Sequence, residues 1–492
     1  MTTSTSKTTQ SPPRPEDENL GLAANLMYGM QHVMTMYGGI IAVPLIIGQA
    51  AGLSGAEIGM LIAASLFVGG LATLLQTIGV PFFGCQLPLV QGVSFASVAT
   101  IVAIVTGGGG LPAVFGAIIA TALIGLLITP IFSKIIQLFP PLVTGTVITT
   151  IGLTLMPVAA GWSMGGDRSA ADFGSMGNIG LAGFTLLVVL LLSKVGNAAI
   201  SRLSILIAMV IGTAVAAALG MTDFAQSIND GPIFALPAPL HFGVPTFELA
   251  AIISMLIVVM VILVETSADI LAVGDIVGTK VDARRLGDGL RADMISSVVG
   301  PFFGSFTQSA FAQNVGLVAV TGIKSRFVVA AAGGILLVLG LLPIMGRVIA
   351  QVPPAVLGGA GLVLFGTVAA SGIRSLARVN YHNNMNLIIV ATSIGFGMIP
   401  ITAPSFYDHF PTWFGTIFHS GISSSAIMAI TLNLLFNHLK FGSSEKATVL
   451  AEVKERIVPV ESVACLNEGD CFIDGKLIDA DGNEVTVVKD VH

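Results

Sequence analysis

Apolar stretches about as long as a membrane is thick recur along this chain from residue 22 to residue 438. An α-helix needs about 20 mostly apolar residues to cross the hydrocarbon core of a bilayer. Only 10% of the residues are charged, against about 25% in a soluble domain. The pattern predicts an all-α, polytopic membrane protein with fourteen transmembrane segments. These are residues 22–48, 57–79, 86–106, 112–136, 140–160, 178–195, 202–220, 247–274, 289–303, 308–323, 326–349, 353–374, 385–401 and 421–438.

Basic residues gather on one side of the predicted membrane. Lys and Arg favour cytoplasmic loops, and with a cytoplasmic N-terminus the outer loops hold only Arg168 and Arg347. We therefore expect a multi-pass protein in the lipid of the cell membrane, with both termini in the cytoplasm.

Polar segments flank the membrane region, which is predicted to span residues 21–440. Residues 1–20 are polar, contain three prolines and lack the apolar core of a signal peptide, so we expect a disordered cytosolic tail. Residues 441–492 predict an acidic, loosely structured cytosolic tail in which Asp481-Gly482-Asn483 can close a hairpin. The three cysteines lack the spacing of a metal site or a disulfide framework, so no metal and no cofactor is predicted.

A short motif opens both the fifth and the twelfth predicted segment. Pro140 begins PPLVTG and Pro353 begins PPAVLG, 213 residues further on (353 − 140). An odd number of segments separates the copies, so the second copy is inverted in the membrane. Segments 86–106 and 308–323, also seven apart, are short or interrupted and predict an extended stretch followed by a half-helix. Paired interrupted segments indicate the binding site of a transporter built from two inverted seven-span repeats.

Carboxamide side chains cluster in the tenth segment, where Gln308, Gln313 and Asn314 lie among small residues. A carboxamide at membrane depth is costly unless it is hydrogen-bonded. The segment is therefore predicted to line a cavity that binds a planar, polar solute. The alternative is that these side chains join neighbouring helices by hydrogen bonds.

Acidic side chains occur in the eighth and ninth segments. Glu265 and Asp269 are four residues apart, on one helical face. A carboxylate at the centre of a membrane helix costs about 2.5–3.5 kcal/mol on insertion scales. Both should therefore face the cavity and take part in proton coupling, with Asp293 as a third candidate. Alternatively, any of the three pairs with a neighbouring hydroxyl and only fixes helix packing.

His32 and Phe95 are further candidates for the site. His32 either faces the solute and Asn314 or is satisfied by a backbone carbonyl. Phe95 lies where the third segment breaks, and its ring either stacks on a flat heterocycle or packs in the core. No catalytic triad, phosphate loop or basic nucleic-acid patch is visible, so neither an enzyme nor a nucleic-acid partner is predicted.

Three motifs together resemble the nucleobase:cation symporter-2 family, also called the nucleobase-ascorbate transporters. They are Gln31-His32, Glu265-x-x-x-Asp269 and Gln313-Asn314-x-Gly316-x-x-x-x-Thr321. The resemblance covers nearly the whole membrane region and implies fourteen spans as two inverted sevens. It implies a core domain of spans 1–4 and 8–11, about residues 21–138 and 247–349. It also implies a gate domain, about residues 139–246 and 350–440, through which two copies form a homodimer.

The resemblance also implies roles for the site residues. Glu265 would hydrogen-bond the ring nitrogens of the substrate, and Gln313 would pair with its carbonyl and N–H edge. Asp269 and Asp293 would serve proton coupling and site organisation, and the remaining residues would tune affinity or frame the ring. These remaining residues are His32, Asn314, Ser94 and Phe95.

Two departures from the uracil permeases favour a purine. Those relatives carry Glu where Gln313 stands and His where Asp269 stands. Ser94 is smaller than the Asn typical of xanthine-selective members, which would leave room for the extra oxygen of urate. The resemblance therefore predicts import of an oxopurine, urate and/or xanthine, by proton symport through alternating access. Alternatives are a uracil or other nucleobase symporter, a sulfate-type anion exchanger of the same fold, a membrane enzyme or a channel, and sodium stays open as the coupling ion.

Overall fold

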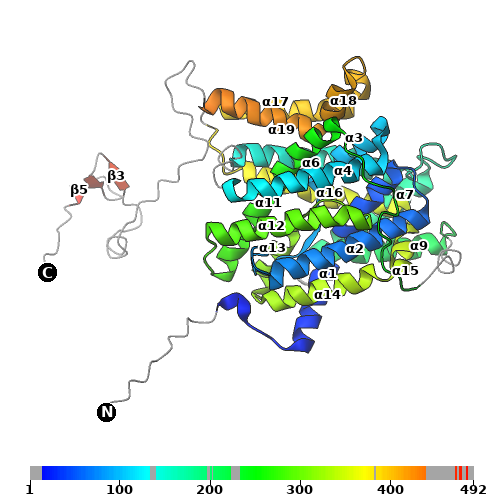
Figure 1. The fold of residues 1–492 in the computed structure, drawn as a ribbon, viewed down its shortest axis with the longest axis horizontal. Coiled ribbons are helices and arrows are strands. Elements are labelled where there is room, and N and C mark those ends of the chain that lie inside the picture. The colour runs from blue at the N-terminus through cyan, green and yellow to red at the C-terminus, as the bar shows by residue number, and fades with distance from the viewer. Residues whose placement is uncertain are drawn as a thin grey trace, which may run out of the picture. The chain divides into compact units, whose positions relative to one another are not determined.

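The computed structural model describes residues 14–132, 140–196, 200–201, 203–222, 233–381 and 384–438, and three short strands after residue 470. The chain divides into two compact units, residues 1–450 and 451–492. The first unit is a bundle of helices (Figure 1), and each of the fourteen predicted segments contains at least one helix of it.

The first half of the bundle consists of α1 (Leu22–Ala50), α2 (Gly55–Ile78), α3 (Val98–Ile104), α4 (Gly110–Ile128), α6 (Pro141–Ser163), α7 (Met176–Val195) and α9 (Ser204–Ala218). The second half consists of α11 (Leu249–Val277), α12 (Ala283–Val299), α13 (Ala312–Thr321), α14 (Arg326–Gly340), α15 (Pro343–Ala350), α16 (Pro354–Leu376), α17 (Asn384–Thr402), α18 (Thr412–Phe418) and α19 (Gly421–Asn433).

Eight helical runs among the described residues are long and apolar enough to cross a membrane, or nine if α14 and α15, bent by 78°, form one span. One of the eight, Phe95–Ile128, contains both α3 and α4, although Gly108 with a φ of 98° breaks the helix between them. Length and hydropathy therefore establish a multi-pass membrane protein. The count of fourteen spans stays a prediction.

The two copies of the double-proline motif begin α6 and α16, with Pro at the first helical position, where its missing N–H costs nothing. These two helices pack closely against each other. A Cβ added at Gly152 would lie 2.3 Å from the backbone nitrogen of Ala369, and one at Gly372 would lie 2.3 Å from that of Thr149. Small residues thus allow the two backbones to meet, as is common between membrane helices.

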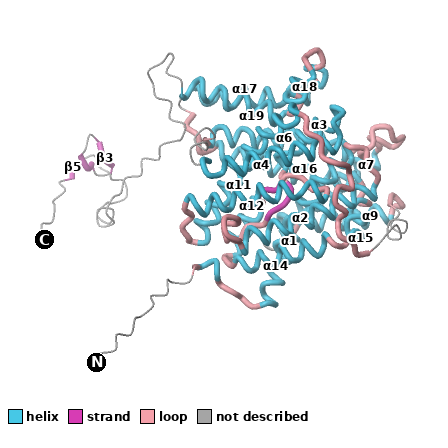
Figure 2. The backbone as a smooth tube through the Cα atoms, viewed as in Figure 1, coloured by secondary structure: helices cyan, strands magenta, loops and turns pink. Residues whose placement is uncertain are grey.

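The interrupted segments contain a strand pair, as predicted. β1 (Gln91–Val93) and β2 (Gln308–Ala310) are antiparallel, with Gly92 opposite Ser309. The pair lies in the middle of the helices (Figure 2). A 3-10 turn, η2 (Phe95–Ser97), and then α3 follow β1, while α13 follows β2 almost at once. Two short helices therefore begin side by side at the centre of the bundle.

Part of the predicted N-terminal tail has a defined position. Residues Pro15–Asp17 form a 3-10 turn, η1, in which Glu16 is fully buried. Glu16 forms an ion pair of 2.6 Å with Arg285 at the start of α12, and Asp17 forms one of 2.6 Å with Arg326 at the start of α14. The expected disorder therefore does not extend over residues 14–20. Residues 1–13 lie outside the described part of the chain.

The second unit contains a small antiparallel sheet of β3 (Cys471–Ile473), β4 (Lys476–Ile478) and β5 (Glu484–Val485). β4 pairs with β5 on either side of the predicted Asp481–Asn483 turn. The turn residues themselves, and residues 439–470, lie outside the described part.

Candidate functional site

A cavity of about 190 Å³ lies where the two short helices begin. The segments Val93–Ala96 and Ser309–Gln313 form one side of it, together with Glu265 of α11. The other side comes from α6 and α16. The residues on that side are Ile148, Ile151, Thr367, Val368 and Ser371.

Four of the predicted substrate-binding residues line this cavity: Glu265, Gln313, Ser94 and Phe95. They come from three separate parts of the chain and offer a carboxyl group, a carboxamide, a hydroxyl and an aromatic ring. No ion pair to Glu265 occurs within the described residues. Its carboxyl group is therefore available to a solute.

The N-terminus of α13 adds backbone donors to the cavity. Its N-cap residue, Phe311, provides no side-chain hydrogen bond. Asn314 N donates to the carbonyl of Phe311 at 2.9 Å, whereas the N–H groups of Ala312 and Gln313 have no intrahelical acceptor. Across the strand pair, Ser94 caps η2 by accepting a hydrogen bond from Ala96 N at 3.3 Å. The cavity therefore offers N–H groups to a carbonyl or anionic oxygen mainly from the α13 side.

Phe95 is held edge-on between two other rings. Its centroid lies 6.4 Å from that of Phe311 and 6.1 Å from that of Phe365, with interplanar angles of 61° and 74°. Such edge-to-face contacts are favourable for aromatic pairs. Phe95 thus packs against core rings and also lines the cavity; stacking on a heterocycle stays a prediction.

His32 and Asn314 do not line the cavity; they are buried behind it, at 2% and 0% exposure. Asn314 Nδ2 donates to the carbonyl of Pro88 at 2.7 Å, so its oxygen accepts a 2.6 Å hydrogen bond from His32 Nδ1. This chain of contacts joins α1, α13 and the residues that lead into β1. Neither side chain therefore faces the cavity in this conformation.

Gln308 also lies behind the cavity. It is fully buried, and its Nε2 donates to Ser305 Oγ at 3.2 Å and to the carbonyl of Phe306 at 2.9 Å. Of the three clustered carboxamides, only Gln313 faces the cavity. Hydrogen bonding within the protein, the alternative interpretation of the cluster, describes Gln308 and Asn314.

The two aspartates are likewise absent from the cavity wall. Asp269 lies one turn after Glu265, and its Oδ2 is buried without a hydrogen-bond partner. Asp293 is fully buried and accepts a 2.7 Å hydrogen bond from Thr266 Oγ1, while its Oδ1 has no partner. The prediction that Asp269 faces the cavity together with Glu265 therefore does not hold in this conformation.

Sequence reasoning missed Thr266 and the α16 hydroxyls, Thr367 and Ser371. Thr266 follows Glu265 directly, and its burial beside Asp293 was not visible from the sequence. Thr367 and Ser371 are four residues apart on one face of α16, and this spacing was the available signal.

Proteins of known kind resemble this chain over most of its length. A model described as Permease family (Xan_ur_permease) matches residues 23–406. The uric acid transporter UacT of Escherichia coli strain K12 is 39% identical over 430 residues, which are 86% of this chain and 89% of that protein. The xanthine permease of Bacillus subtilis strain 168 is 38% identical over 436 residues, 89% of this chain and 98% of that protein.

Solved structures share the fold at low sequence identity. The transmembrane domain of the cyanobacterial bicarbonate transporter BicA matches with a TM-score of 0.53 at 15% identity, over 84% of this chain and 98% of that one. The murine anion transporter Slc26a9, in its inward-facing state, matches with a TM-score of 0.57 at 13% identity, over 87% of this chain and 73% of that one. The fold is thus that of a membrane transporter.

The family resemblance inferred from the three motifs is confirmed. The matched family and relatives are permeases, which also confirms the prediction that this protein is a transporter and not an enzyme. The chain therefore belongs to the Permease family, the nucleobase:cation symporter-2 transporters.

Proposed function

We propose that this permease carries an oxopurine, urate and/or xanthine, across the cell membrane together with protons. The observation that carries the proposal is the single cavity that brings Glu265, Gln313 and Ser94 beside the ring of Phe95. The names of the relatives, a uric acid transporter and a xanthine permease, indicate the substrate class.

The chemistry of the cavity suits an oxopurine. The carboxamide of Gln313 has both donors and an acceptor, which match a carbonyl and N–H edge. Glu265 can accept hydrogen bonds from ring N–H groups, and the α13 N-terminus can donate to a second carbonyl. Phe95 provides an aromatic face or edge for the flat ring. The small hydroxyl of Ser94 leaves space beside these groups.

We also propose the fourteen-span architecture of two inverted repeats. Supporting it, several helix packings recur when the halves are matched, α1 with α11, α2 with α12, α4 with α14, α6 with α16, α7 with α17 and α9 with α19. The packing of α2 on α14 corresponds to that of α12 on α4. Likewise, the packing of α7 on α16 corresponds to that of α17 on α6, and the packing of α9 on α16 to that of α19 on α6. In this proposal α1–α4 and α11–α15 form the core, and α6–α9 and α16–α19 form the gate.

Proton coupling would follow from the cost of charge in the membrane. With Glu265 ionised and the cavity empty, movement of the core past the apolar gate side, such as Ile148 and Ile151, would carry an uncompensated charge. A proton on the Glu265, Asp269 and Asp293 group, together with bound solute, would remove that cost. Sodium in place of the proton would make uptake depend on sodium and not on the proton gradient.

An anion exchanger of the same fold is the second candidate, favoured by the free α13 N-terminus at the cavity and by the fold of BicA. Glu265 in the cavity wall opposes it, because a carboxylate repels an anion.

For the assembly, we propose a homodimer through the gate, where α7 exposes Leu187, Leu190 and Leu191. Cross-linking in membranes tests this arrangement.

The test is uptake of radiolabelled urate and xanthine in cells that express the protein, with uracil as competitor and with or without a protonophore. Saturable uptake that the protonophore abolishes and uracil does not inhibit is the expected result. Uptake that depends on sodium and not on the proton gradient would show that sodium is the coupling ion. Uptake of neither purine, with bicarbonate or sulfate exchange instead, would establish the second candidate.

A further inference from the structure

A second and larger cavity, of about 560 Å³, continues from the first along two helices. Residues 94–96, which precede α3, line the first cavity, whereas Val98 and Val102 of α3 and Thr106, just after it, line the second. On α6, Ile151 lines the first cavity and Leu155 the second. We call the second cavity the vestibule, because it is lined by the residues that follow those of the candidate site in both of these segments.

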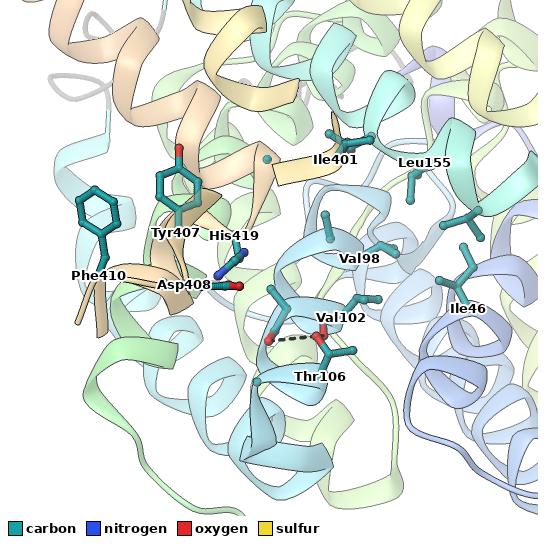
Figure 3. Close-up of a pocket in the computed structure, with 17 residues that line it drawn as sticks. Ile46, Val98, Val102, Thr106, Leu155, Ile401, Tyr407, Asp408, Phe410 and His419 are labelled. Carbon is teal, nitrogen blue, oxygen red and sulfur yellow. Dashed lines mark hydrogen bonds between the residues drawn. The ribbon is translucent and has the colours of Figure 1, made fainter. Parts of the chain in front are cut away.

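The walls of the vestibule are mostly apolar, and a carboxyl group and an imidazole ring interrupt them. These belong to Asp408 and His419, and the phenol of Tyr407 also lies among the described lining residues. Figure 3 shows the two side chains beside each other, directed toward Val98 and Val102 across the cavity. No ion pair joins Asp408 to a cation within the described residues, and its exposed side chain lines the vestibule.

The aromatic neighbours of Asp408 hold it in place. Tyr407 is 4% exposed, and its ring centroid lies 4.9 Å from that of Phe406 and 5.9 Å from that of Phe410. His419 rests edge-on against Tyr407, with the ring centroids 5.6 Å apart. The residue before Asp408 is thus anchored in a packed ring cluster, although the segment that carries both residues connects two helices.

We propose that Asp408 is a specificity-determining residue, a fixed negative charge in the vestibule that slows anionic solutes on their way to the candidate site. A charge in a cleft with apolar walls is poorly screened, and it changes the local concentration of charged solutes. The inference rests on the proposed function, because urate is an anion at neutral pH whereas xanthine is largely uncharged. Asp408 then favours the neutral oxopurine over the anionic one.

Thiol labelling tests the charge without any assumption about the substrate. In a Thr106→Cys variant, the new thiol lies in the vestibule, where Thr106 is exposed. We compare its rates of reaction with an anionic and a cationic methanethiosulfonate at about pH 7.5, where an ordinary histidine is neutral. Adding Asp408→Asn should raise the anionic-to-cationic rate ratio by about 3-fold or more at low salt, and Asp408→Glu should leave it unchanged. The protein without the Thr106→Cys change corrects for the native cysteines.

Transport then tests the consequence. Asp408→Asn should raise kcat/KM for urate by about 2- to 10-fold at low ionic strength and leave that for xanthine unchanged. The difference should shrink in added inert salt, since the screening length falls from about 30 Å at 0.01 M to about 8 Å at 0.15 M. An unchanged labelling ratio, or equal changes for both purines, would overturn the inference. If the wild type transports neither purine, the proposed function fails, and the labelling ratio alone decides the role of Asp408.

Discussion

Thr266 on α11 donates a hydrogen bond of 2.7 Å to Asp293 on α12. Both residues are fully buried, and the same hydroxyl accepts a longer hydrogen bond, 3.4 Å, from the backbone nitrogen of Ala310 in β2. Ala310 lines the candidate site, as does Glu265, the residue before Thr266. One hydroxyl therefore connects the buried acid with two parts of the cavity wall.

Replacing Thr266 by Val should impair transport, whereas Thr266→Ser should preserve it. Valine has nearly the same shape but leaves a buried carboxyl oxygen without its donor, which costs about 1–3 kcal/mol. We expect a drop of about tenfold in kcat/KM for the transported purine, since 1.4 kcal/mol corresponds to a factor of ten. Initial uptake rates, normalised to the protein at the cell surface, measure the effect. Equal uptake by the Val and Ser variants would show that the hydrogen bond is dispensable.

Glu265→Gln should abolish concentrative uptake. The substitution keeps the size of the side chain and one accepting oxygen but removes its ability to take up and release a proton in the cavity. Accumulation against a gradient, with and without a protonophore, is the measurement, and exchange of solute down its gradient is the control for folding. Full accumulation with unchanged pH dependence would contradict a coupling role for this residue.

Ser94→Asn should shift selectivity from urate toward xanthine. The larger side chain would fill space beside Phe95 and Gln313, but Asn can still cap the following turn as Ser94 does. We expect the ratio of kcat/KM for urate to that for xanthine to fall several-fold, and Ser94→Ala to change it much less. A ratio that stays constant in Ser94→Asn would remove this residue from the determinants of specificity.

The His32–Asn314 pair should behave as a single unit. The two side chains form a hydrogen bond with each other and do not line the cavity. Asn314→Ala and His32→Ala should therefore each weaken transport. The double variant should be little worse than either single one, since contacting residues are energetically coupled. A double-mutant cycle on kcat/KM provides the test, and additive effects would mean that at least one of them contacts the solute directly.

Glu16→Gln should lower the thermal stability of the purified protein without changing KM. The buried carboxylate accepts from the guanidinium of Arg285, and loss of a hydrogen bond between charged groups costs about 1.5–3 kcal/mol. The exposed side chain of Glu18, two residues further along, offers the matched control, Glu18→Gln. The measurement is the midpoint temperature of unfolding of the protein in detergent. Equal midpoints for the two variants would show that the N-terminal ion pair contributes nothing to stability.

The sequence alone determined the membrane class, the extended stretches at 86–106 and 308–323, and the placing of Glu265 and Gln313 beside a cavity. These features follow from costs that act locally: apolar runs must enter lipid, and polar groups inside the runs must find partners. Such costs require a partner for each polar group but do not say whether it is a solute or the protein itself.

Only the tertiary structure decided that question. It turned Asn314 toward His32 and Pro88, and Asp293 toward Thr266, partners that are distant in the sequence or on another element. It also bound Glu16 to Arg285 and set Asp408 beside His419 at the vestibule. The physical reason is that a side chain's partner depends on which elements pack against it, and packing between segments hundreds of residues apart leaves no trace in the periodicity or spacing of either one.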